Sequence, residues 1–140
     1  MPWDRRSTHE PRGDDSPPRL LILDDEEAIL LPISEYFRQR RYHVAATREP
    51  EEAEALLDHD PFDLVILDLA LTRFGREGLE VLSAIRARRP WLPVVILSGY
   101  ISDEVENEAR LLRADAVLRK PQPLDELARV ADALMGWRKP

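Results

Sequence analysis

The sequence predicts an α/β fold, in which a doubly wound, five-stranded parallel sheet carries helices on both faces. Two observations predict it: five short apolar runs have the length of strands, and the segments between them repeat apolar residues at helical spacing. The runs follow one another about every 22 residues, which is room for one strand, one helix and their loops. Strands that alternate with helices in this way favour parallel pairing, because each helix carries the chain back to the edge where the previous strand began.

The five apolar runs lack polar alternation, which predicts strands that are covered on both faces. A sheet with one face in water would instead show apolar and polar residues in turn. The predicted strands are residues 20–23, 42–46, 64–67, 94–97 and 116–118.

The segments between these runs place apolar residues three or four positions apart, which is the spacing of one helix face. The faces are Ile29, Ile33 and Phe37; Ala53, Leu56 and Leu57 in a shorter helix at 50–57; Leu79, Leu82 and Ile85; Ile101, Val105, Ala109 and Leu112; and Leu124, Leu127, Ala131 and Leu134. Pro32 lies beyond the first turn of the first helix, so it should cost a hydrogen bond or cause a kink.

At 140 residues, of which 44% are hydrophobic, the chain has room for one domain with one core. We assign this domain to residues 19–136. Residues 1–18 hold four prolines among charged and small polar residues. This composition predicts a disordered tail, because little apolar area is available to offset the entropy of ordering. Residues 137–140 form a short C-terminal tail, and we expect a stand-alone domain because no output domain follows the last predicted helix.

The composition also excludes several kinds of site. The chain has no cysteine, and its three histidines are scattered, which argues against disulfides, thiolate sites and zinc. No apolar run approaches the ~20 residues that cross a bilayer, and the N-terminus lacks a secretion signal, so we expect a cytoplasmic protein with no membrane partner. The net charge of -7 disfavours nucleic acid and makes other proteins the expected partners.

Polar residues that can carry chemistry follow four of the five predicted strands. In open parallel sheets, ligands bind beyond the carboxyl ends of the strands, so these residues should gather at one edge. They are Asp24 and Asp25 after the first strand, Asp68 after the third, Ser98 after the fourth and Lys120, beyond Arg119, after the fifth.

Taken singly, each of these residues has an ordinary structural role. An aspartate after a strand is more often a turn former or a helix N-cap, and Ser98-Gly99 is an ordinary turn. The combination is more informative, because three neighbouring carboxylates repel one another unless a cation lies among them. Mg²⁺ suits such a set of oxygen ligands. Lys120 is one of only two lysines beside 18 arginines, which favours a position that requires a compact charge.

At these positions the sequence resembles the receiver domains of two-component response regulators, the CheY-like superfamily. The resemblance implies the flavodoxin-like (βα)5 version of the predicted fold, and it spans nearly all of the chain after the tail. The matching segments are residues 20–27, 64–69, 77–82, 94–99 and 114–121.

The resemblance implies a role for each polar residue. Asp68 would accept a phosphoryl group from a histidine kinase or a histidine phosphotransfer protein. Asp25 would bind Mg²⁺ directly and Asp24 through water, while Asp68 and the backbone carbonyl of Ala70 would complete the protein's share of the metal ligands. Ser98 would contact the phosphoryl group, and Lys120 would pair with its oxygens.

The expected function is therefore that of a receiver that signals to an unknown downstream protein through phosphorylation-dependent interaction, as a monomer or a weak homodimer. Its chemistry would be limited to its own phosphorylation and dephosphorylation, so we do not expect an enzyme. The main alternative is a degenerate receiver that acts as a phosphorylation-independent interaction module. A haloacid dehalogenase phosphatase needs a second acid where Ala70 stands, and a flavodoxin would bind phosphate where Asp24 and Asp25 repel it.

Three features depart from the family's pattern. The loop after Asp68 lacks the usual proline and is about two residues longer, which puts the shape of that loop in doubt. Val117 stands where an aromatic residue often swings inward on phosphorylation, so the usual switch cannot operate. Arg113 replaces a common glycine in the turn before the fifth strand, so we expect a non-glycine residue in that backbone conformation.

Overall fold

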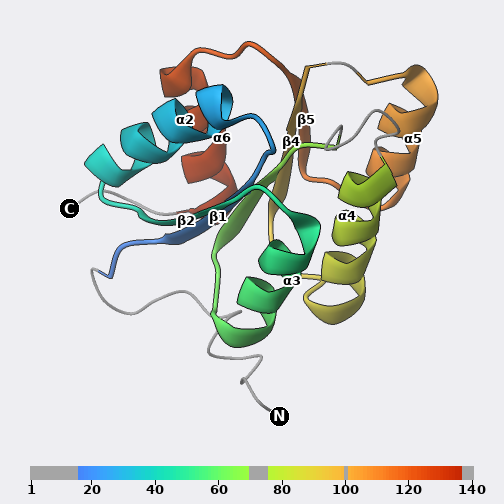
Figure 1. Ribbon diagram of the computed structural model, residues 1–140, viewed down its shortest axis with the longest axis horizontal. Coiled ribbons are helices and arrows are strands. Elements are labelled where there is room, and N and C mark those ends of the chain that lie inside the picture. The colour runs from blue at the N-terminus through green and yellow to red at the C-terminus, as the bar shows by residue number, and fades with distance from the viewer. Residues whose placement is uncertain (1–15, 70–75, 100, 137–140) are drawn as a thin grey trace.

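The described residues of the computed structural model, 16–69, 76–99 and 101–136, form one parallel sheet whose strands alternate with helices (Figure 1). The strand order is β2-β1-β3-β4-β5, which confirms the predicted doubly wound α/β fold. The strands are β1 (Arg19–Leu23), β2 (His43–Thr47), β3 (Leu64–Leu67), β4 (Val94–Ser98) and β5 (Ala116–Arg119). The helices are α2 (Glu27–Gln39), α3 (Pro50–His59), α4 (Arg76–Arg88), α5 (Asp103–Leu111) and α6 (Leu124–Met135).

The two faces of the sheet carry separate halves of the core. Successive residues of a strand point to opposite faces, so Leu21 and Leu23 of β1 pack in the cluster beneath α3, α4 and α5. Leu20 and Ile22 pack in the cluster beneath α2 and α6. Figure 1 shows these two groups of helices on opposite sides of the sheet.

The three central strands confirm the expectation of strands covered on both faces, whereas the two edge strands do not. All residues of β3 and β4 are buried. In contrast, β2 exposes His43 and Ala46, and β5 has no buried residue and exposes Arg119. Each edge strand has only one neighbouring strand, so part of it faces solvent although its sequence is apolar. The second strand also runs one residue later than the predicted 42–46.

The helix α2 continues through Pro32. Proline has no N–H, so the carbonyl of Ala28 loses its usual donor within the helix. Both Ala28 and Pro32 are exposed, and water can therefore take the missing bond. The hydrogen bond that Pro32 removes is thus replaced at the surface, and the helix keeps its buried face of Ile33 and Phe37.

The helix α5 is shorter than its apolar pattern suggested. Ser102 precedes it as the N-cap, and its hydroxyl accepts a hydrogen bond from the Val105 N–H at 3.1 Å. Ile101 and Leu112 therefore lie just outside the helix. Ile101 is buried and Leu112 is partly buried, so both still contribute to the core.

The turn before β5 confirms the expectation for Arg113, which adopts a left-handed backbone conformation with φ of 66°. Its carbonyl accepts hydrogen bonds from the buried guanidinium of Arg86, at 3.1 Å from Nε and 2.8 Å from Nη2. Arg86 also pairs with the carboxylate of Asp115 at 2.9 Å. Burial lowers the pKa of Arg86, while Asp115 opposes that shift. The Arg86 side chain from α4 thus stabilises the turn, in which a glycine would adopt the left-handed conformation without steric cost.

At the start of the domain, Pro18 is buried, and its carbonyl accepts a hydrogen bond from the His43 N–H at 2.9 Å. Pro18 therefore belongs with the folded domain and not with the tail to which we assigned it. Residues 1–15 of that predicted tail, and the predicted C-terminal tail, 137–140, lie outside the described residues. Within the part of the chain that the structure describes, no helix is long and apolar enough to span a membrane.

Candidate functional site

The backbone ladder brings the predicted polar residues to one edge of the sheet. The strand pairing extends past the strand ends, because the Asp68 N–H donates to the Leu23 carbonyl and the Lys120 N–H to the Ser98 carbonyl, each at 3.0 Å. The Asp24 N–H likewise donates to the carbonyl of Thr47 at 3.1 Å. These bonds fix where the side chains leave the backbone, which is at the carboxyl ends of adjacent strands.

Asp68 lies at the centre of this site with only 3% of its surface exposed. The Ser98 hydroxyl donates a hydrogen bond to its Oδ1 at 2.7 Å. The Lys120 ammonium donates to its Oδ2 at 3.2 Å. The carboxylate is therefore held on both oxygens by the two side chains that the sequence placed at the ends of the fourth and fifth predicted strands.

Lys120 bridges three carboxylates. Its Nζ lies 2.8 Å from Asp24 Oδ2, 3.2 Å from Asp68 Oδ2 and 3.2 Å from Glu26 Oε1. Burial of the ammonium acts to lower its pKa, but the hydrogen bond to Asp24 and the charges of Asp68 and Asp24 outweigh burial. The net effect raises the pKa of Lys120 above its ordinary value, so the side chain is a fixed positive charge at neutral pH.

The site holds more negative charge than this lysine can balance. Burial raises the pKa of Asp24, against the hydrogen bonds that it receives from Lys120 and from the Glu26 N–H. Burial also raises the pKa of Asp25, and the neighbouring charges of Asp68 and Glu26 add to that increase. Both shifts indicate that the carboxylates would be stabilised by a further cation.

The donor set fits a hard divalent cation. Asp24, Asp25, Glu26 and Asp68 each offer a carboxylate oxygen, and these oxygens all lie within 4.8 Å of one another. Mg²⁺ prefers oxygen ligands and uses one or two carboxylates together with water and phosphate oxygens. The predicted ligands Asp24, Asp25 and Asp68 are thus brought together, whereas Ala70 lies outside the described residues.

Sequence reasoning did not single out Glu26. It stood inside the matching segment 20–27, but no role was attached to it. The structure places its carboxylate against Lys120, which is 94 positions away in the chain. The sequence signal was only a third acid after Asp24 and Asp25, and such a residue is most often a solvated helix start.

Sequence reasoning also gave no role to Gly78, which lies within the matching segment 77–82. A Cβ at this position would lie 2.7 Å from the Asp68 carbonyl oxygen and closer still to the Leu69 Cα. The absence of a side chain therefore lets the first turn of α4 pack directly on the backbone that carries Asp68. A glycine near a predicted helix start was the available signal.

Two of the three positions that depart from the family pattern, Arg113 and Val117, lie within the described residues. Val117 is partly buried and packs against the core cluster beneath α3, α4 and α5, so no aromatic ring occupies this position. Residues 70–75 of the loop after Asp68 lie outside the described residues, as does Tyr100.

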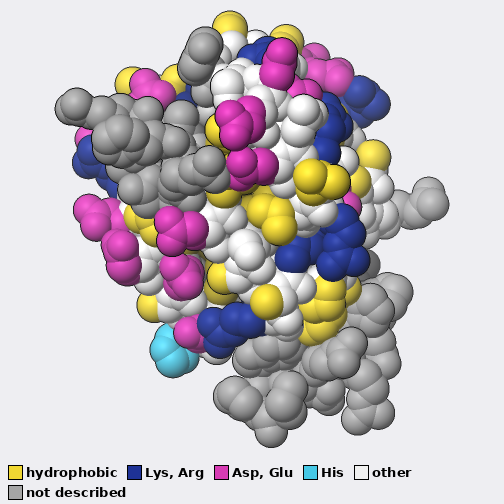
Figure 2. Space-filling model, turned by 90° about the vertical axis from the view of Figure 1, so that its right-hand side faces the viewer, with side chains coloured by type: hydrophobic (Ala, Val, Ile, Leu, Met, Phe, Trp, Pro, Cys, Tyr) yellow, Lys and Arg dark blue, Asp and Glu magenta, His cyan; other side chains and the backbone are white. Residues whose placement is uncertain are grey.

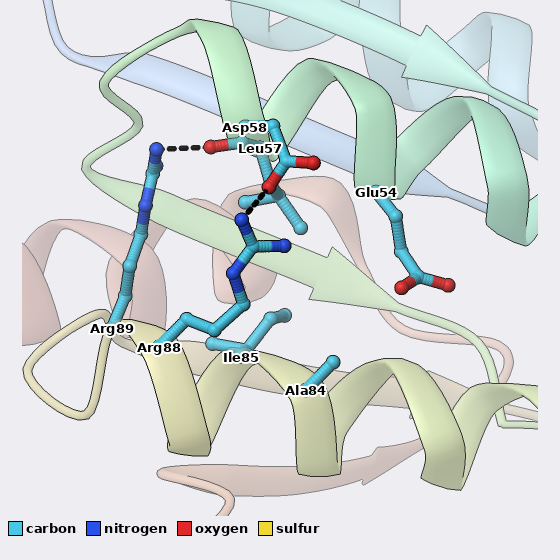
Figure 3. A pocket seen from close by; sticks show the side chains of 7 residues that line it. All are labelled: Glu54, Leu57, Asp58, Ala84, Ile85, Arg88 and Arg89. Atoms are coloured by element: carbon cyan, nitrogen blue, oxygen red, sulfur yellow. Dashed lines mark hydrogen bonds and ion pairs between the residues drawn. The ribbon is translucent and has the colours of Figure 1, made fainter. Parts of the chain in front are cut away.

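A pocket between α3 and α4 is separate from this site (Figure 3). It takes in about 280 Å³ including its open mouth, and its apolar floor is formed by Leu57 and Ile85. Arg88 forms an ion pair with Asp58 at one end. Most of the lining residues lie in the second halves of α3 and α4, while Glu54 lies at the middle of α3 and Arg89 follows the end of α4. In a βα fold these helix ends lie toward the amino edge of the sheet, so the pocket does not share the carboxyl edge with Asp68.

Fold and site together define a receiver. The sequence model of the response regulator receiver domain matches residues 20–132 of this chain. The chain therefore belongs to the response regulator receiver domain family, as its strand-end residues led us to expect.

Curated relatives include longer regulators. The alginate biosynthesis transcriptional regulatory protein AlgB of Pseudomonas aeruginosa is 37% identical over 110 residues, which cover 78% of this chain and 24% of AlgB. The regulatory protein VanR of Enterococcus faecium is 30% identical over 122 residues, which cover 86% of this chain and 52% of VanR. The chain thus spans between about a quarter and a half of the length of these relatives.

Solved receiver structures match over most of their length. A CheY-like receiver domain protein from Methanospirillum hungatei has a TM-score of 0.78 and 29% identity, and the match covers 85% of this chain and 94% of that one. The non-phosphorylated HemR receiver domain of Leptospira biflexa has a TM-score of 0.77 and 27% identity, covering 88% and 98%. These likenesses support the receiver fold independently of the sequence motifs.

Proposed function

We propose that this receiver takes a phosphoryl group onto Asp68 in a Mg²⁺-dependent reaction and signals through phosphorylation-dependent protein interaction. The observation that carries the proposal is the position of the Asp68 carboxylate, which lies between the Ser98 hydroxyl and the Lys120 ammonium beside an acidic cluster. A nucleophile, a hydroxyl and a fixed positive charge are the groups that phosphoryl transfer to a carboxylate requires.

In the proposed step, an oxygen of Asp68 attacks the phosphorus of a phosphohistidine in line. The new P–O bond forms as the P–N bond breaks, and the histidine nitrogen leaves with the bonding electrons. Lys120 and Ser98 then face the phosphoryl oxygens, and their N–H and O–H donors stabilise the charge on the transferring group. Attack by water on the acyl phosphate would return Asp68 to its free carboxylate.

The metal ligands in this proposal are Asp25, Asp68 and the carbonyl of Ala70, with Asp24 acting through water. When held by these residues, Mg²⁺ would supply positive charge that offsets the negative charge of the phosphoryl oxygens. Without a cation, the same acids would repel an anionic phosphodonor.

We further infer that the phosphodonor is a histidine kinase or a histidine phosphotransfer protein, and that the phosphorylated form binds a downstream protein. The chemistry is confined to the receiver's own phosphorylation and dephosphorylation, so no other substrate is turned over. Action in the cytoplasm and as a stand-alone domain stay predictions, and the longer relatives show that the same domain also occurs within larger regulators.

Val117 supports a second candidate, which is a degenerate receiver that binds its partner regardless of phosphorylation. The family's aromatic switch is replaced at this position by a β-branched side chain that is stiff about χ1. Partner binding that is unchanged by phosphorylation would favour this second candidate.

A small-molecule phosphodonor with Mg²⁺ tests the main proposal. We expect intact-mass measurement to show one added phosphoryl group on the native protein and none on Asp68→Asn, because the amide lacks the nucleophilic carboxylate. A matched control is Asp63→Asn, which removes a carboxylate at the opposite end of β3. Equal labelling of Asp68→Asn and the native protein would contradict Asp68 as the acceptor.

A further inference from the structure

Glu26 occupies the N-cap position of α2, but its side chain does not cap the helix. An N-cap side chain usually accepts a hydrogen bond from the first turn of its own helix. The Glu26 carboxylate instead accepts a hydrogen bond from Lys120 Nζ at 3.2 Å, across the edge of the sheet. Its backbone N–H donates to Asp24 Oδ1 at 2.9 Å. One residue therefore contacts two members of the site, one through its backbone and the other through its side chain.

The three carboxylate partners of Lys120 would have different roles in the proposed phosphorylation. Asp68 becomes the phosphorylated residue, and Asp24 serves the metal. The proposed function gives Glu26 neither role, and its side chain is 61% exposed whereas that of Lys120 is only 11% exposed. Its carboxylate thus approaches the ammonium from the solvent side, where the oxygens of an incoming phosphoryl group would also have to bind.

We propose that Glu26 is a positioning residue that holds Lys120 in the unphosphorylated receiver and competes with the phosphoryl group for that ammonium. This inference rests on the proposed function. Lys120 has three N–H donors, which the three carboxylates now engage. A phosphoryl group can gain a bond from Lys120 only if one of these partners gives way, and the exposed Glu26 is the least constrained of them.

The competition sets the sign of the effect. Replacing Glu26 by Gln keeps the size of the side chain and the backbone bond to Asp24 but removes the negative charge. Lys120 should then be held less firmly in the free protein and be more available to a phosphoryl group. Because the pair is partly exposed, we expect a change of about two- to fivefold in each measurement below.

The first measurement uses the metal-free protein and needs no phosphorylation chemistry. The chain has two lysines, Lys120 and Lys139, so a limiting amine-acetylating reagent can be followed at both by peptide mass spectrometry. We expect faster acetylation at Lys120 in Glu26→Gln and no change at Lys139. Glu27→Gln is the matched control, because it removes the same charge from the adjacent exposed residue.

The second measurement is the affinity for beryllium fluoride, a phosphoryl mimic, by calorimetry at saturating Mg²⁺. We expect Glu26→Gln to bind the mimic more tightly than the native protein and Glu27→Gln to match the native protein. The Mg²⁺ affinity of each variant is measured alongside, together with that of Asp25→Ala.

Faster Lys120 acetylation and tighter mimic binding in Glu26→Gln alone would support the proposal. Unchanged acetylation at Lys120 would overturn it, because Glu26 would then not hold the ammonium. Equal changes in Glu26→Gln and Glu27→Gln would also overturn it, because Glu26 would then act only through overall charge. Weaker or unchanged binding of the mimic by Glu26→Gln would show that Glu26 does not compete with the phosphoryl group for Lys120, which would also overturn the proposal. A loss of Mg²⁺ affinity as large as that of Asp25→Ala would make Glu26 a metal ligand and also overturn it.

Failure of the proposed function would give a different result. In that case neither the native protein nor any variant would bind the mimic. Faster acetylation of Lys120 in Glu26→Gln would still support the contact between Glu26 and Lys120.

Discussion

At the scale of single residues, the site is a balance of charge around one buried aspartate. Asp68 receives a hydrogen bond on each carboxylate oxygen, and Lys120 shares its charge among Asp68, Asp24 and Glu26. The raised pKa values of Asp24 and Asp25, caused first by burial, indicate that one ammonium does not compensate all of the acids. A group whose pKa is raised on folding loses its contribution to stability as the pH rises through that pKa, so at neutral pH its ionisation opposes folding.

Asp25→Ala tests this balance. At neutral pH we expect the metal-free variant to melt at a higher temperature than the native protein, because a carboxylate whose ionisation opposes folding is gone. We expect Mg²⁺ to stabilise the variant less, by about 1.4 kcal/mol for each tenfold loss of affinity. Thermal melts with and without Mg²⁺ measure both effects, and Glu27→Ala is the control for net charge. An undiminished Mg²⁺-induced rise in melting temperature would count against Asp25 as a ligand.

At the scale of elements, the helix α4 contacts two backbone segments that lead to site residues. The first turn of α4 packs on the backbone of Asp68 and Leu69 because Gly78 has no side chain. Near the C-terminal end of α4, Arg86 binds the turn that precedes β5. The same helix therefore supports both the strand end that carries Asp68 and the turn that leads to Lys120.

Gly78→Ala should disturb this arrangement. Its Cβ would lie 2.7 Å from the Asp68 carbonyl oxygen, so backbone has to move, which typically costs about 1–3 kcal/mol. Alanine favours helix by about 1 kcal/mol over glycine, and this gain should offset only part of the cost. We expect a lower urea midpoint and slower labelling by a phosphodonor. Ser83→Ala, at an exposed position of α4, should change neither, and a Gly78→Ala variant as stable and as reactive as the native protein would show that the backbone there is not constrained.

At the scale of the whole molecule, phosphorylation of Asp68 would have to change a surface that a partner protein can contact. The face that α4 and α5 present carries acidic, basic and apolar side chains side by side (Figure 2). Exposed Leu111 lies at the end of α5, and Arg119 of β5 pairs with Glu106 of α5 at 3.1 Å. This face is therefore a mixed surface, with no single kind of side chain predominating. With Val117 in place of the aromatic switch, movement of Ser98 and of the loop that follows it becomes the expected route.

Hydrogen exchange with and without beryllium fluoride tests that route, because local opening reports which segments the ligand restrains. We expect protection at residues 68–78 and 98–103 and a smaller change at 115–118. Tyr100, which lies outside the described residues, offers a substitute aromatic in this loop, so Tyr100→Ala should reduce the spread of protection. Strong protection through β5 and its neighbouring helices that persists in Tyr100→Ala would show that coupling needs no aromatic residue.

The sequence by itself determined the order of elements and the identity of most of the site. Apolar runs and helical spacing predicted the strands and helices, because these periodicities follow from backbone geometry alone. Asp24, Asp25, Asp68, Ser98 and Lys120 were identified by a topological rule, since the carboxyl ends of parallel strands share an edge. No distance between them was needed for that prediction.

Only the tertiary structure decided the contacts that join distant parts of the chain. It made β2 and β5 the edges of the sheet, which exposed parts of two apolar runs that the sequence predicted to be covered. It brought Glu26 to Lys120 and Gly78 to the backbone of Asp68. Each of these depends on strand order and on the packing of a helix against a loop. Local periodicity carries no information about such distances, because it describes a residue's own element and not the one that packs against it.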